Sequence, residues 1–472
     1  MKTWSSFFVI VIVASLVISS GCSQPPAPAT PAQVPQPPAP GSPGGTGTIT
    51  PGDLTLLVRD AVAYARANGK DAAIAAFNDP NGSFVRNGSY IFAEGYDGTA
   101  LAEPFEHELV GTNVRNMTDR YGVPLVRNLG ETAGYGIGFV SYDYPDPADS
   151  RIVRPRLAVA GDVDGTWYIG SDTRSASVIV YPSSVIGPAT HPYTVDGLTA
   201  FVKNATAYAR ANGKEKALSA FNDPKGPFTD GELYVMALDF NGTVLANGIS
   251  PQTADNRINL INYHDPDGVR TIREMRDLAK QEGGFSYTVA AVTKDKKTYF
   301  APKIDYAEPV DTSYWIFAGI ILPRYEQLRE GNLTGVAIRS HTRAEVYDLV
   351  NRAAGFARAN GSAGAIAEIG KPKGMFANGD LFTWAEGFNG TILADPYWAE
   401  GAGTNQMNYT DPYGAKTTVV GINAIRSGTG FTHAVFPDTA QDKTAPIPKL
   451  IYMQAVDDQW WIGSGIYGIQ VA

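Results

Sequence analysis

Hydrophobic residues in the first part of the folded chain follow the spacing of an amphipathic helix. Leu54, Leu57, Val58, Ala61 and Ala65 recur at intervals of three and four, which places them on one helical face. An Asn-Gly pair follows at 68–69, where glycine takes the backbone conformation that ends a helix. The pattern therefore predicts a long helix ending near residue 68. A second, short helix is expected over residues 71–77.

Strand-like patterns follow these helices. Residues 90–96, an Asp-Gly turn at 97–98 and residues 99–102 predict a β-hairpin. A loop segment then leads to three further predicted strands, around residues 138–142, 156–161 and 166–171. A helical start followed by about five antiparallel strands indicates an α+β fold.

The same pattern occurs three times along the chain. Residues 63–70 recur letter for letter at 207–214, and a weaker third copy stands at 356–361. Further landmarks keep the same order: Asx-Gly-Thr turns at Asp97, Asn241 and Asn389; Asp-x-x-Gly at Asp119, Asp265 and Asp411; a cation after proline at Arg156, Lys303 and Lys449; and a closing strand at Trp167, Trp315 and Trp461. A period near 146 is too long for a solenoid repeat, so three domains are predicted, over 50–187, 194–335 and 342–472.

The amino terminus is typical of an exported protein. Lys2 precedes an apolar run through Ile18, and this run is shorter than a bilayer span. Ser19-Ser20-Gly21-Cys22 resembles a lipoprotein processing site, which implies that residues 1–22 are a signal segment and that Cys22 carries the lipid. An uncleaved anchor and an ordinary secreted protein are the alternatives. Residues 23–49 are rich in proline and glycine, carry no charge and predict an extended tether.

Composition excludes several functions. The net charge of −9 argues against a nucleic-acid partner, which would need a basic surface. A single cysteine excludes a disulfide framework and a multi-cysteine zinc site. Five scattered histidines give no paired metal motif, and no nucleophile elbow, phosphate loop or catalytic carboxylate pair stands out. We therefore expect no cofactor, no metal and no enzyme activity.

The order of these motifs resembles the single Cache domain, type 2. The resemblance rests on the helix, the hairpin around Asp-Gly-Thr, Gly-Thr-Asn at 111–113 and 403–405, and the ending at 448–452 and 460–467. It implies three tandem PAS-like domains, each with a long and a short helix packed on a roughly five-stranded antiparallel sheet. It also implies an extracytoplasmic sensor that binds a small organic acid or amino acid. The second copy lacks Gly-Thr-Asn.

Candidate ligand-binding residues come from the recurring positions. A cation at the start of a central strand can hold a carboxylate, and aromatic side chains can wall an apolar pocket. The alternatives are a solvated strand end for the cations, core packing for the rings, a satisfied histidine, and turn chemistry for the asparagines. The candidates are Lys449, His433, Trp384, Tyr397 and Asn405 in the third copy, and Arg156, Tyr142, Phe92 and Asn113 in the first.

We expect a pocket in the third copy, then in the first, and none in the second. In the second copy Gln252-Thr253-Ala254-Asp255 replaces Gly-Thr-Asn, and Asp255 would repel an acidic ligand. The working hypothesis is a sensor or solute-binding protein on the outer face of the cytoplasmic membrane that signals through a membrane partner. A structural or adhesion protein without a ligand is the alternative, and a hydrolase or enzyme accessory is the third candidate.

Nine Asn-x-Ser/Thr sequons fit a glycosylated cell surface. They stand at Asn81, Asn87, Asn116, Asn204, Asn241, Asn332, Asn360, Asn389 and Asn408.

Overall fold

The fold is described from a computed structural model. It describes residues 49–146, 149–173, 189, 193–428, 430–438 and 445–471. The expected signal segment, Cys22 and the expected tether up to residue 48 lie outside the described residues. Within the described part, no helix combines the length and the apolar character needed to cross a membrane.

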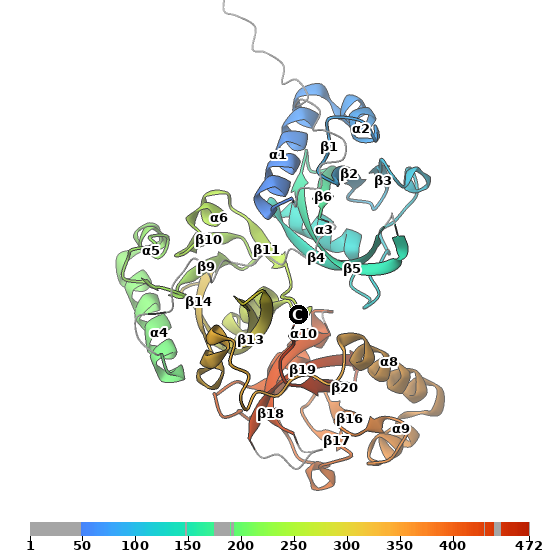
Figure 1. Ribbon diagram of the computed structural model, residues 1–472, viewed down its shortest axis with the longest axis vertical. Coiled ribbons are helices and arrows are strands. Elements are labelled where there is room, and N and C mark those ends of the chain that lie inside the picture. The colour runs from blue at the N-terminus through green and yellow to red at the C-terminus, as the bar shows by residue number, and fades with distance from the viewer. Residues whose placement is uncertain are drawn as a thin grey trace, which may run out of the picture.

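Three sheets form the framework of the molecule, and they share one strand order (Figure 1). We call the parts that carry them unit 1 (49–173), unit 2 (193–335) and unit 3 (342–471). The orders of the five main antiparallel strands are β3-β2-β6-β5-β4 in unit 1, β10-β9-β14-β13-β12 in unit 2 and β17-β16-β20-β19-β18 in unit 3. The expectation of a mixed α+β fold with antiparallel sheets is confirmed.

The element bounds agree with this repeated order. Unit 1 contains α1 (Pro51–Asn68), α2 (Lys70–Phe77), β1 (Val85–Arg86), β2 (Ser89–Gly95), β3 (Ala100–Ala102), α3 (Leu125–Gly134), β4 (Ile137–Asp146), β5 (Asp149–Asp162) and β6 (Trp167–Asp172). Unit 2 contains α4 (Val195–Asn212), α5 (Lys214–Phe221), β7 (Thr229–Asp230), β8 (Leu233–Tyr234), β9 (Met236–Asp239), β10 (Val244–Asn247), α6 (Pro251–Asp255), β11 (Asn259–Asn262), α7 (Thr271–Ala279), β12 (Gly284–Lys294), β13 (Lys297–Pro309) and β14 (Tyr314–Ile321). Unit 3 contains α8 (Arg343–Asn360), α9 (Ser362–Ile369), β15 (Ala377–Asn378), β16 (Leu381–Gly387), β17 (Ile392–Ala394), α10 (Thr417–Arg426), β18 (Phe431–Pro437), β19 (Pro446–Ala455) and β20 (Trp460–Tyr467). Short 3-10 helices lie at His107–Leu109, Pro323–Glu330 and Ala399–Gly401.

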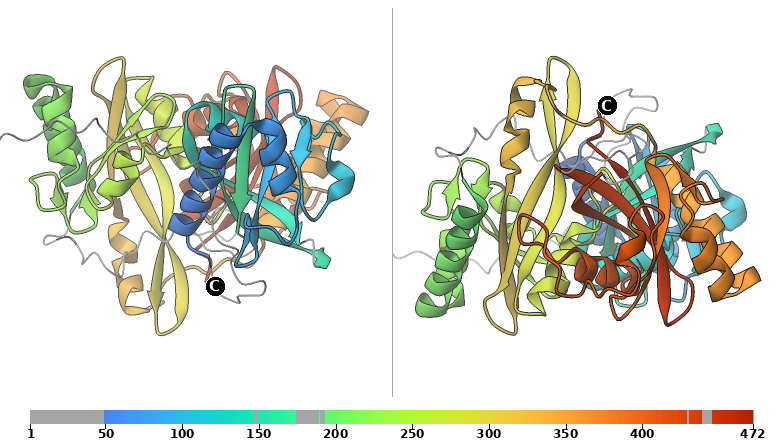
Figure 2. Two further views of the ribbon diagram at one scale, coloured as in Figure 1. Left: turned by 90° about the horizontal axis from the view of Figure 1, so that it is seen from above. Right: turned by 90° about the horizontal axis from the view of Figure 1, so that it is seen from below.

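The predicted helix pair opens every unit. A threonine caps each long helix, and at Thr50 and Thr342 the capping is reciprocal with an acidic residue three positions later. Gly69, Gly213 and Gly361 join the long helix to the short one with φ near +80°. The helix pairs α4–α5 and α8–α9 lie on opposite outer flanks of the molecule (Figure 2).

A third helix in each unit, α3, α7 or α10, lies where the sequence predicts only a loop. In unit 1, α1 packs on strand residues that include Leu157 and Val159. Helix α3 packs on the alternate residues Ala158 and Ala160, which belong to the opposite face of the sheet. Each sheet is therefore covered by the helix pair on one face and by the third helix on the other.

The three Asx-Gly-Thr turns occupy equivalent places. They join β2 to β3, β9 to β10 and β16 to β17, and their glycines have φ of 80–90°. The three Asp-x-x-Gly segments are also equivalent, since each precedes the third helix of its unit. In each of them Oδ1 of Asp119, Asp265 or Asp411 accepts two backbone N–H groups of the following turn.

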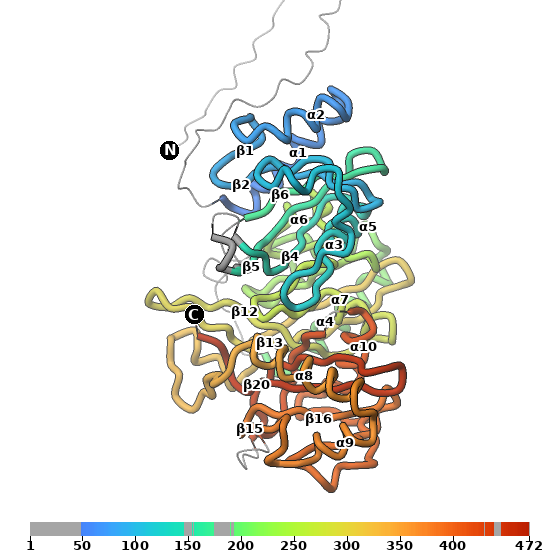
Figure 3. The backbone as a smooth tube through the Cα atoms, turned by 90° about the vertical axis from the view of Figure 1, so that its right-hand side faces the viewer, coloured from blue at the N-terminus to red at the C-terminus, as the bar shows by residue number. Residues whose placement is uncertain are grey.

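The units are joined by shared structure as well as by sequence. Strand β11 of unit 2 pairs in parallel with β4, and this pairing extends the sheet of unit 1. Units 2 and 3 exchange equivalent contacts: His433 of β18 hydrogen-bonds Asp265 at 2.8 Å, and Tyr287 of β12 donates to Asp411 at 2.5 Å. Figure 3 shows the units following one another from blue to red along the long axis.

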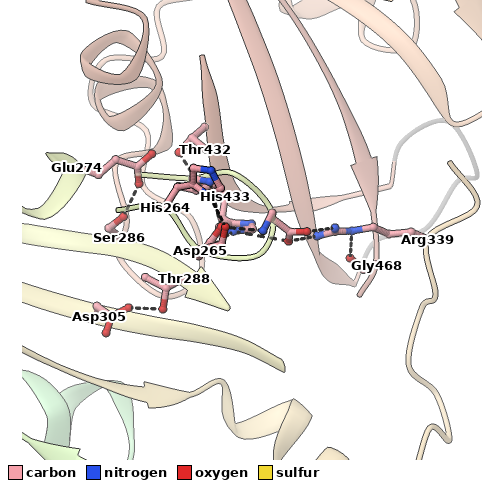
Figure 4. A network of polar contacts seen from close by, with 12 residues as sticks. His264, Asp265, Glu274, Ser286, Thr288, Asp305, Arg339, Thr432, His433 and Gly468 are labelled. Carbon is pink, nitrogen blue, oxygen red and sulfur yellow. Dashed lines mark hydrogen bonds and ion pairs between the residues drawn. The ribbon is translucent and has the colours of Figure 1, made fainter. Parts of the chain in front are cut away.

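A buried ion pair completes the contact between units 2 and 3 (Figure 4). Arg339 donates to both carboxylate oxygens of Asp267, at 2.6 and 2.7 Å, and to the carbonyl of Gly468 at 3.1 Å. The Arg339 and Asp267 side chains are only 7 % and 1 % exposed. A bidentate ion pair that is buried away from water stabilises the fold only while both partners are present, because the loss of one leaves the other charge buried and uncompensated.

Replacing Arg339 with Met should lower the free energy of unfolding by about 3 kcal/mol, because the buried Asp267 would lose its bidentate partner and keep only His433, whose Nε2 lies 3.8 Å from Asp267 Oδ2. The shift of the urea unfolding midpoint measures this loss. Lys371→Met is the control: Lys371 pairs with Glu368 at 2.7 Å but is 61 % exposed, so its loss should cost about 1 kcal/mol or less. Equal shifts in the two variants would contradict the structural role of the buried pair.

Candidate functional site

Each unit contains a cavity between its sheet and its third helix. The cavity volumes are about 60 Å³ in unit 1, 170 Å³ in unit 2 and 310 Å³ in unit 3. The expectation that unit 2 has no pocket is therefore wrong. Asp255, from which we inferred repulsion of ligands in unit 2, is an exposed residue at the end of α6 and does not line the cavity.

The unit 3 cavity is the largest of the three, and seven of its eighteen lining residues are aromatic. Its walls come from β16, β17, β18, β19, β20, α10 and the loop between β17 and α10. The lining residues are Phe382, Trp384, Glu386, Ile392, Asp395, Trp398, Gln406, Tyr409, Thr417, Thr418, Thr432, Phe436, Pro437, Lys449, Ile451, Met453, Trp461 and Tyr467.

Two glycines of β20 make room for this cavity. A Cβ at Gly463 would lie 2.6 Å from the Trp384 ring, and a Cβ at Gly465 would lie 2.8 Å from the Lys449 side chain. Both approaches are closer than real Cβ contacts allow. The Gly-x-Gly of the closing strand therefore lets a large ring and a long cation lie flat against the sheet.

Lys449 is the central polar group of the unit 3 cavity. It is 4 % exposed, and its ammonium group donates to the Tyr467 hydroxyl at 3.2 Å. The ring centres of Phe382, Trp384 and Tyr467 lie 4.9, 4.8 and 4.3 Å from Nζ. Among the described residues no carboxylate lies within ion-pair distance of it. Burial lowers the Lys449 pKa to about 8, and Asp395 and Asp438 oppose this shift only in part.

Other polar atoms that line the unit 3 cavity also lack partners within the described part of the chain. They are Oε1 of Glu386, Oγ1 of Thr417 and Nε1 of Trp461, all buried. Burial raises the Glu386 pKa to about 7. Asp395 Oδ1 accepts N–H groups of Tyr397 and Trp398. Buried polar groups are normally paired, so this set indicates a cavity built to receive a polar molecule.

The equivalent cation of unit 1 has an internal counter-ion. Arg156 Nη1 lies 2.8 Å from Asp172 Oδ2, and Tyr142 donates to the same oxygen at 3.0 Å. Both Arg156 and Asp172 are buried. Ser171 pairs with Val159 in unit 1, and Ser464 pairs with Tyr452 in unit 3, so the two serines hold equivalent positions. The next residue along each strand is Asp172 in unit 1 and Gly465 in unit 3, and these two positions are therefore equivalent as well. A carboxylate of the protein thus occupies the position open to a ligand in unit 3.

In unit 2 the counter-ion of the equivalent cation stands two residues further along the same strand. Lys303 lies 3.0 Å from Asp305, which also accepts from Thr288 at 2.8 Å. Asp305 stands two residues after Lys303, where unit 3 has Ile451 after Lys449. Of the three equivalent cations, Lys449 therefore differs in having no carboxylate of the described chain beside it.

The structure places four of the nine candidate ligand residues outside the cavities. His433 points to the opposite face of its sheet and bonds Asp265 of unit 2, because it alternates with the cavity residue Thr432. Tyr397 packs edge-on against Phe382 and donates to the Pro372 carbonyl. Asn405 and Asn113 are exposed turn residues that donate to the carbonyls of Asn389 and Asp97.

The remaining candidates do line cavities. Lys449 and Trp384 belong to the unit 3 cavity, and Arg156, Tyr142 and Phe92 belong to the unit 1 cavity. Sequence reasoning missed the cavity residues Tyr467, Asp395, Phe382 and Trp398. The alternation of side chains along a strand indicates that Phe382 lines the same cavity, since it stands two residues before Trp384 and shares its face.

The nine sequon asparagines are all exposed. No group of three or more potential metal-ligating side chains is present among the described residues.

Comparison with known proteins identifies the family. The profile of the Single Cache domain 2 family matches residues 47–178 and 198–322, together more than half of the chain. The chain belongs to the Single Cache domain 2 family. Cache domains are extracytoplasmic sensor domains that bind ligands rather than catalyse reactions. The two matched segments correspond to units 1 and 2.

Solved chemoreceptor structures show weaker similarity. A methyl-accepting chemotaxis protein of Vibrio parahaemolyticus is 19 % identical, with 26 % of this chain and 85 % of that chain covered and a TM-score of 0.22. The ligand-binding domain of Pseudomonas fluorescens chemoreceptor CtaA with L-isoleucine is 13 % identical, covering 58 % and 85 %, with a TM-score of 0.19. That of Pseudomonas aeruginosa PctB with L-Arg is 12 % identical, covering 58 % and 87 %, with a TM-score of 0.20. At these scores they support no detailed structural argument.

A curated relative matches a short stretch. The segment polarity protein dishevelled homolog DVL-1 of Pan troglodytes is 31 % identical over 112 residues, which are 22 % of this chain. The chain spans only 17 % of that protein's length.

Removing the two buried cations should affect stability in opposite ways. Lys449→Met should leave the unliganded protein as stable or more stable, because a desolvated ammonium without a counter-ion is replaced by an apolar side chain. Arg156→Met should lower stability by about 3–5 kcal/mol, because Asp172 stays buried without its partner. Thermal unfolding without added solutes compares the two variants. A loss at Lys449 as large as that at Arg156 would show that Lys449 is a structural cation.

Proposed function

We propose that unit 3 is a third Cache domain and the ligand-binding unit of an extracytoplasmic sensor, and that its ligand is a small molecule with a carboxylate group. The observation that carries this proposal is the buried Lys449 ammonium, which faces a cavity of about 310 Å³ with no carboxylate of the described chain beside it.

A ligand carboxylate would complete the polar arrangement around Lys449. The ammonium has three N–H donors, and Tyr467 accepts one of them. A carboxylate at the other two would form charge-assisted hydrogen bonds in a largely dry place. The rings of Phe382, Trp384 and Trp461 would then contact the apolar part of the molecule, which is the usual composition of a small-molecule site.

Asp395 extends the proposal to amino acids. It lines the same cavity, and its Oδ1 is held by two backbone N–H groups, while Oδ2 has no partner among the described residues. A carboxylate in that position favours a cationic group on the ligand. We therefore include amino acids beside simple organic acids, with Lys449 facing the carboxylate and Asp395 facing the ammonium.

Units 1 and 2 do not take part in acid recognition under this proposal. Their equivalent cations, Arg156 and Lys303, are already neutralised by Asp172 and Asp305. An acidic ligand would have to break an ion pair whose carboxylate is buried, which is costly.

The structural or adhesion alternative requires cavities that are packed shut. The open cavity of unit 3 and its unpartnered polar atoms count against that alternative. We further propose that the chain is anchored by lipid at Cys22, on the outer face of the cytoplasmic membrane, and passes its signal to a membrane partner.

A thermal-shift screen of organic acids and amino acids on the detergent-purified full chain should yield a ligand with micromolar affinity, about −8 kcal/mol. Lys449→Met should weaken its binding at least about 100-fold, because the cation is lost. Ile451→Asp should have a similar effect, because it gives Lys449 the internal counter-ion that Lys303 has in Asp305.

Lys303→Met is the matched control for this titration. It removes the equivalent cation of unit 2 and should leave the affinity unchanged. Calorimetric titration of the three variants decides the assignment. Retained affinity in a folded Lys449→Met protein, together with lost affinity in Lys303→Met, would place the ligand in unit 2 instead.

Lipid anchoring is tested separately. In Cys22→Ser cells the protein should leave the membrane fraction, because the thiol that would carry the lipid is absent. Fractionation with immunoblotting measures this, with the unchanged chain as control. An unaltered membrane share in the Cys22→Ser cells would show that something other than a lipid at Cys22 holds the protein.

A further inference from the structure

The unit 2 cavity has a different chemistry from that of unit 3. It has a volume of about 170 Å³ and lies between α7 and the sheet of unit 2. Met236, Leu260, Ile272, Met275 and Phe317 supply most of its apolar wall.

Every charged group that lines the unit 2 cavity already has a partner within the protein. Lys303 pairs with Asp305 at 3.0 Å, and Glu232 pairs with Arg329. Asp265 uses Oδ1 for two backbone N–H groups and Oδ2 for His433. Among the side-chain atoms that line this cavity, none within the described residues is buried without a hydrogen-bond partner, in contrast to the unit 3 cavity.

Substitutions between the two units explain the contrast. Strand register places Phe317 where unit 3 has Gly463, so a ring fills part of the space. It also places Met236 at the position of Trp384. Methionine is unbranched and adapts its shape to small apolar partners. The unit 2 cavity is thus smaller, and its polar groups are internally satisfied.

We propose that the unit 2 cavity binds a small uncharged apolar molecule, of about the size of benzene or toluene. Apolar cavities of about 150 Å³ stay free of water and accept benzene, and the unit 2 cavity has a similar volume. A carboxylate is excluded because Asp305 is 1 % exposed and occupies the place beside Lys303 that it would need. Such an apolar molecule would gain van der Waals contacts with the cavity wall that water cannot provide.

The proposal does not depend on acid binding in unit 3, and the experiment keeps the two apart. The Lys449→Met chain serves as the background, so that any carboxylate site in unit 3 is removed. Toluene and benzoate are the probes, because they share a ring and differ in charge. Toluene should raise the Tm by about 2 °C in a saturable way, and benzoate should give no shift.

Two variants in this background test the location. Ala290→Leu adds bulk to the cavity wall without removing a polar partner, and it should abolish the toluene shift. Asp305→Ile copies the residue that unit 3 carries at this position, frees Lys303 and should create a benzoate shift. Far-UV circular dichroism verifies that each variant is folded.

Saturable toluene binding that is lost in Ala290→Leu, together with benzoate binding gained in Asp305→Ile, supports the proposal. Benzoate binding before the Asp305 change would overturn it, because the ion pair would then not exclude acids. A toluene shift that survives in folded Ala290→Leu would also overturn it, since the molecule would then bind elsewhere. No toluene shift at any concentration up to its solubility would show that the cavity does not bind apolar molecules.

Discussion

Each unit carries a cation at the same position of a central strand, and much of the chemistry of this protein follows from how each unit compensates that charge. Unit 1 supplies Asp172 from the adjacent strand, and unit 2 supplies Asp305 from the same strand. Unit 3 surrounds Lys449 with aromatic rings, which attract a cation but replace a counter-ion only in part. One repeated backbone thus carries two closed ion pairs and one open cation.

Membership of a sensor family explains why such a position exists, and the substitutions explain why the copies differ. At one of these positions Gly465 leaves its side of the sheet bare in unit 3, whereas Asp172 fills the equivalent place in unit 1. Duplication within one chain relaxes the demand on any single copy. Under the proposed function, units 1 and 2 carry closed ion pairs, while unit 3 retains a partly unsatisfied site that costs stability.

The local parts of this structure could be predicted from the sequence, and the long-range parts could not. Hydrophobic spacing located the helix pairs, and the Asx-Gly-Thr turns located the hairpins. The third helix of unit 1 also has a local signal, because Leu125, Leu129 and Ala133 keep helical spacing. The partners of Arg156 and His433 lie 16 and 168 residues away and depend on strand register and on packing between units. Neither is encoded in a local pattern.

The contacts between units have a mechanical consequence. Asp265 with His433, Asp411 with Tyr287, and Arg339 with Asp267 join units 2 and 3 through buried polar bonds, while β11 continues the sheet of unit 1. A hinge motion of one unit against another would leave several of these groups desolvated and unpaired, at a cost of several kcal/mol for each ion pair. These contacts therefore oppose a hinge motion between the units of the described chain. Under the proposed function, a membrane partner would therefore have to recognise a local change of shape on the surface rather than a hinge motion of whole units.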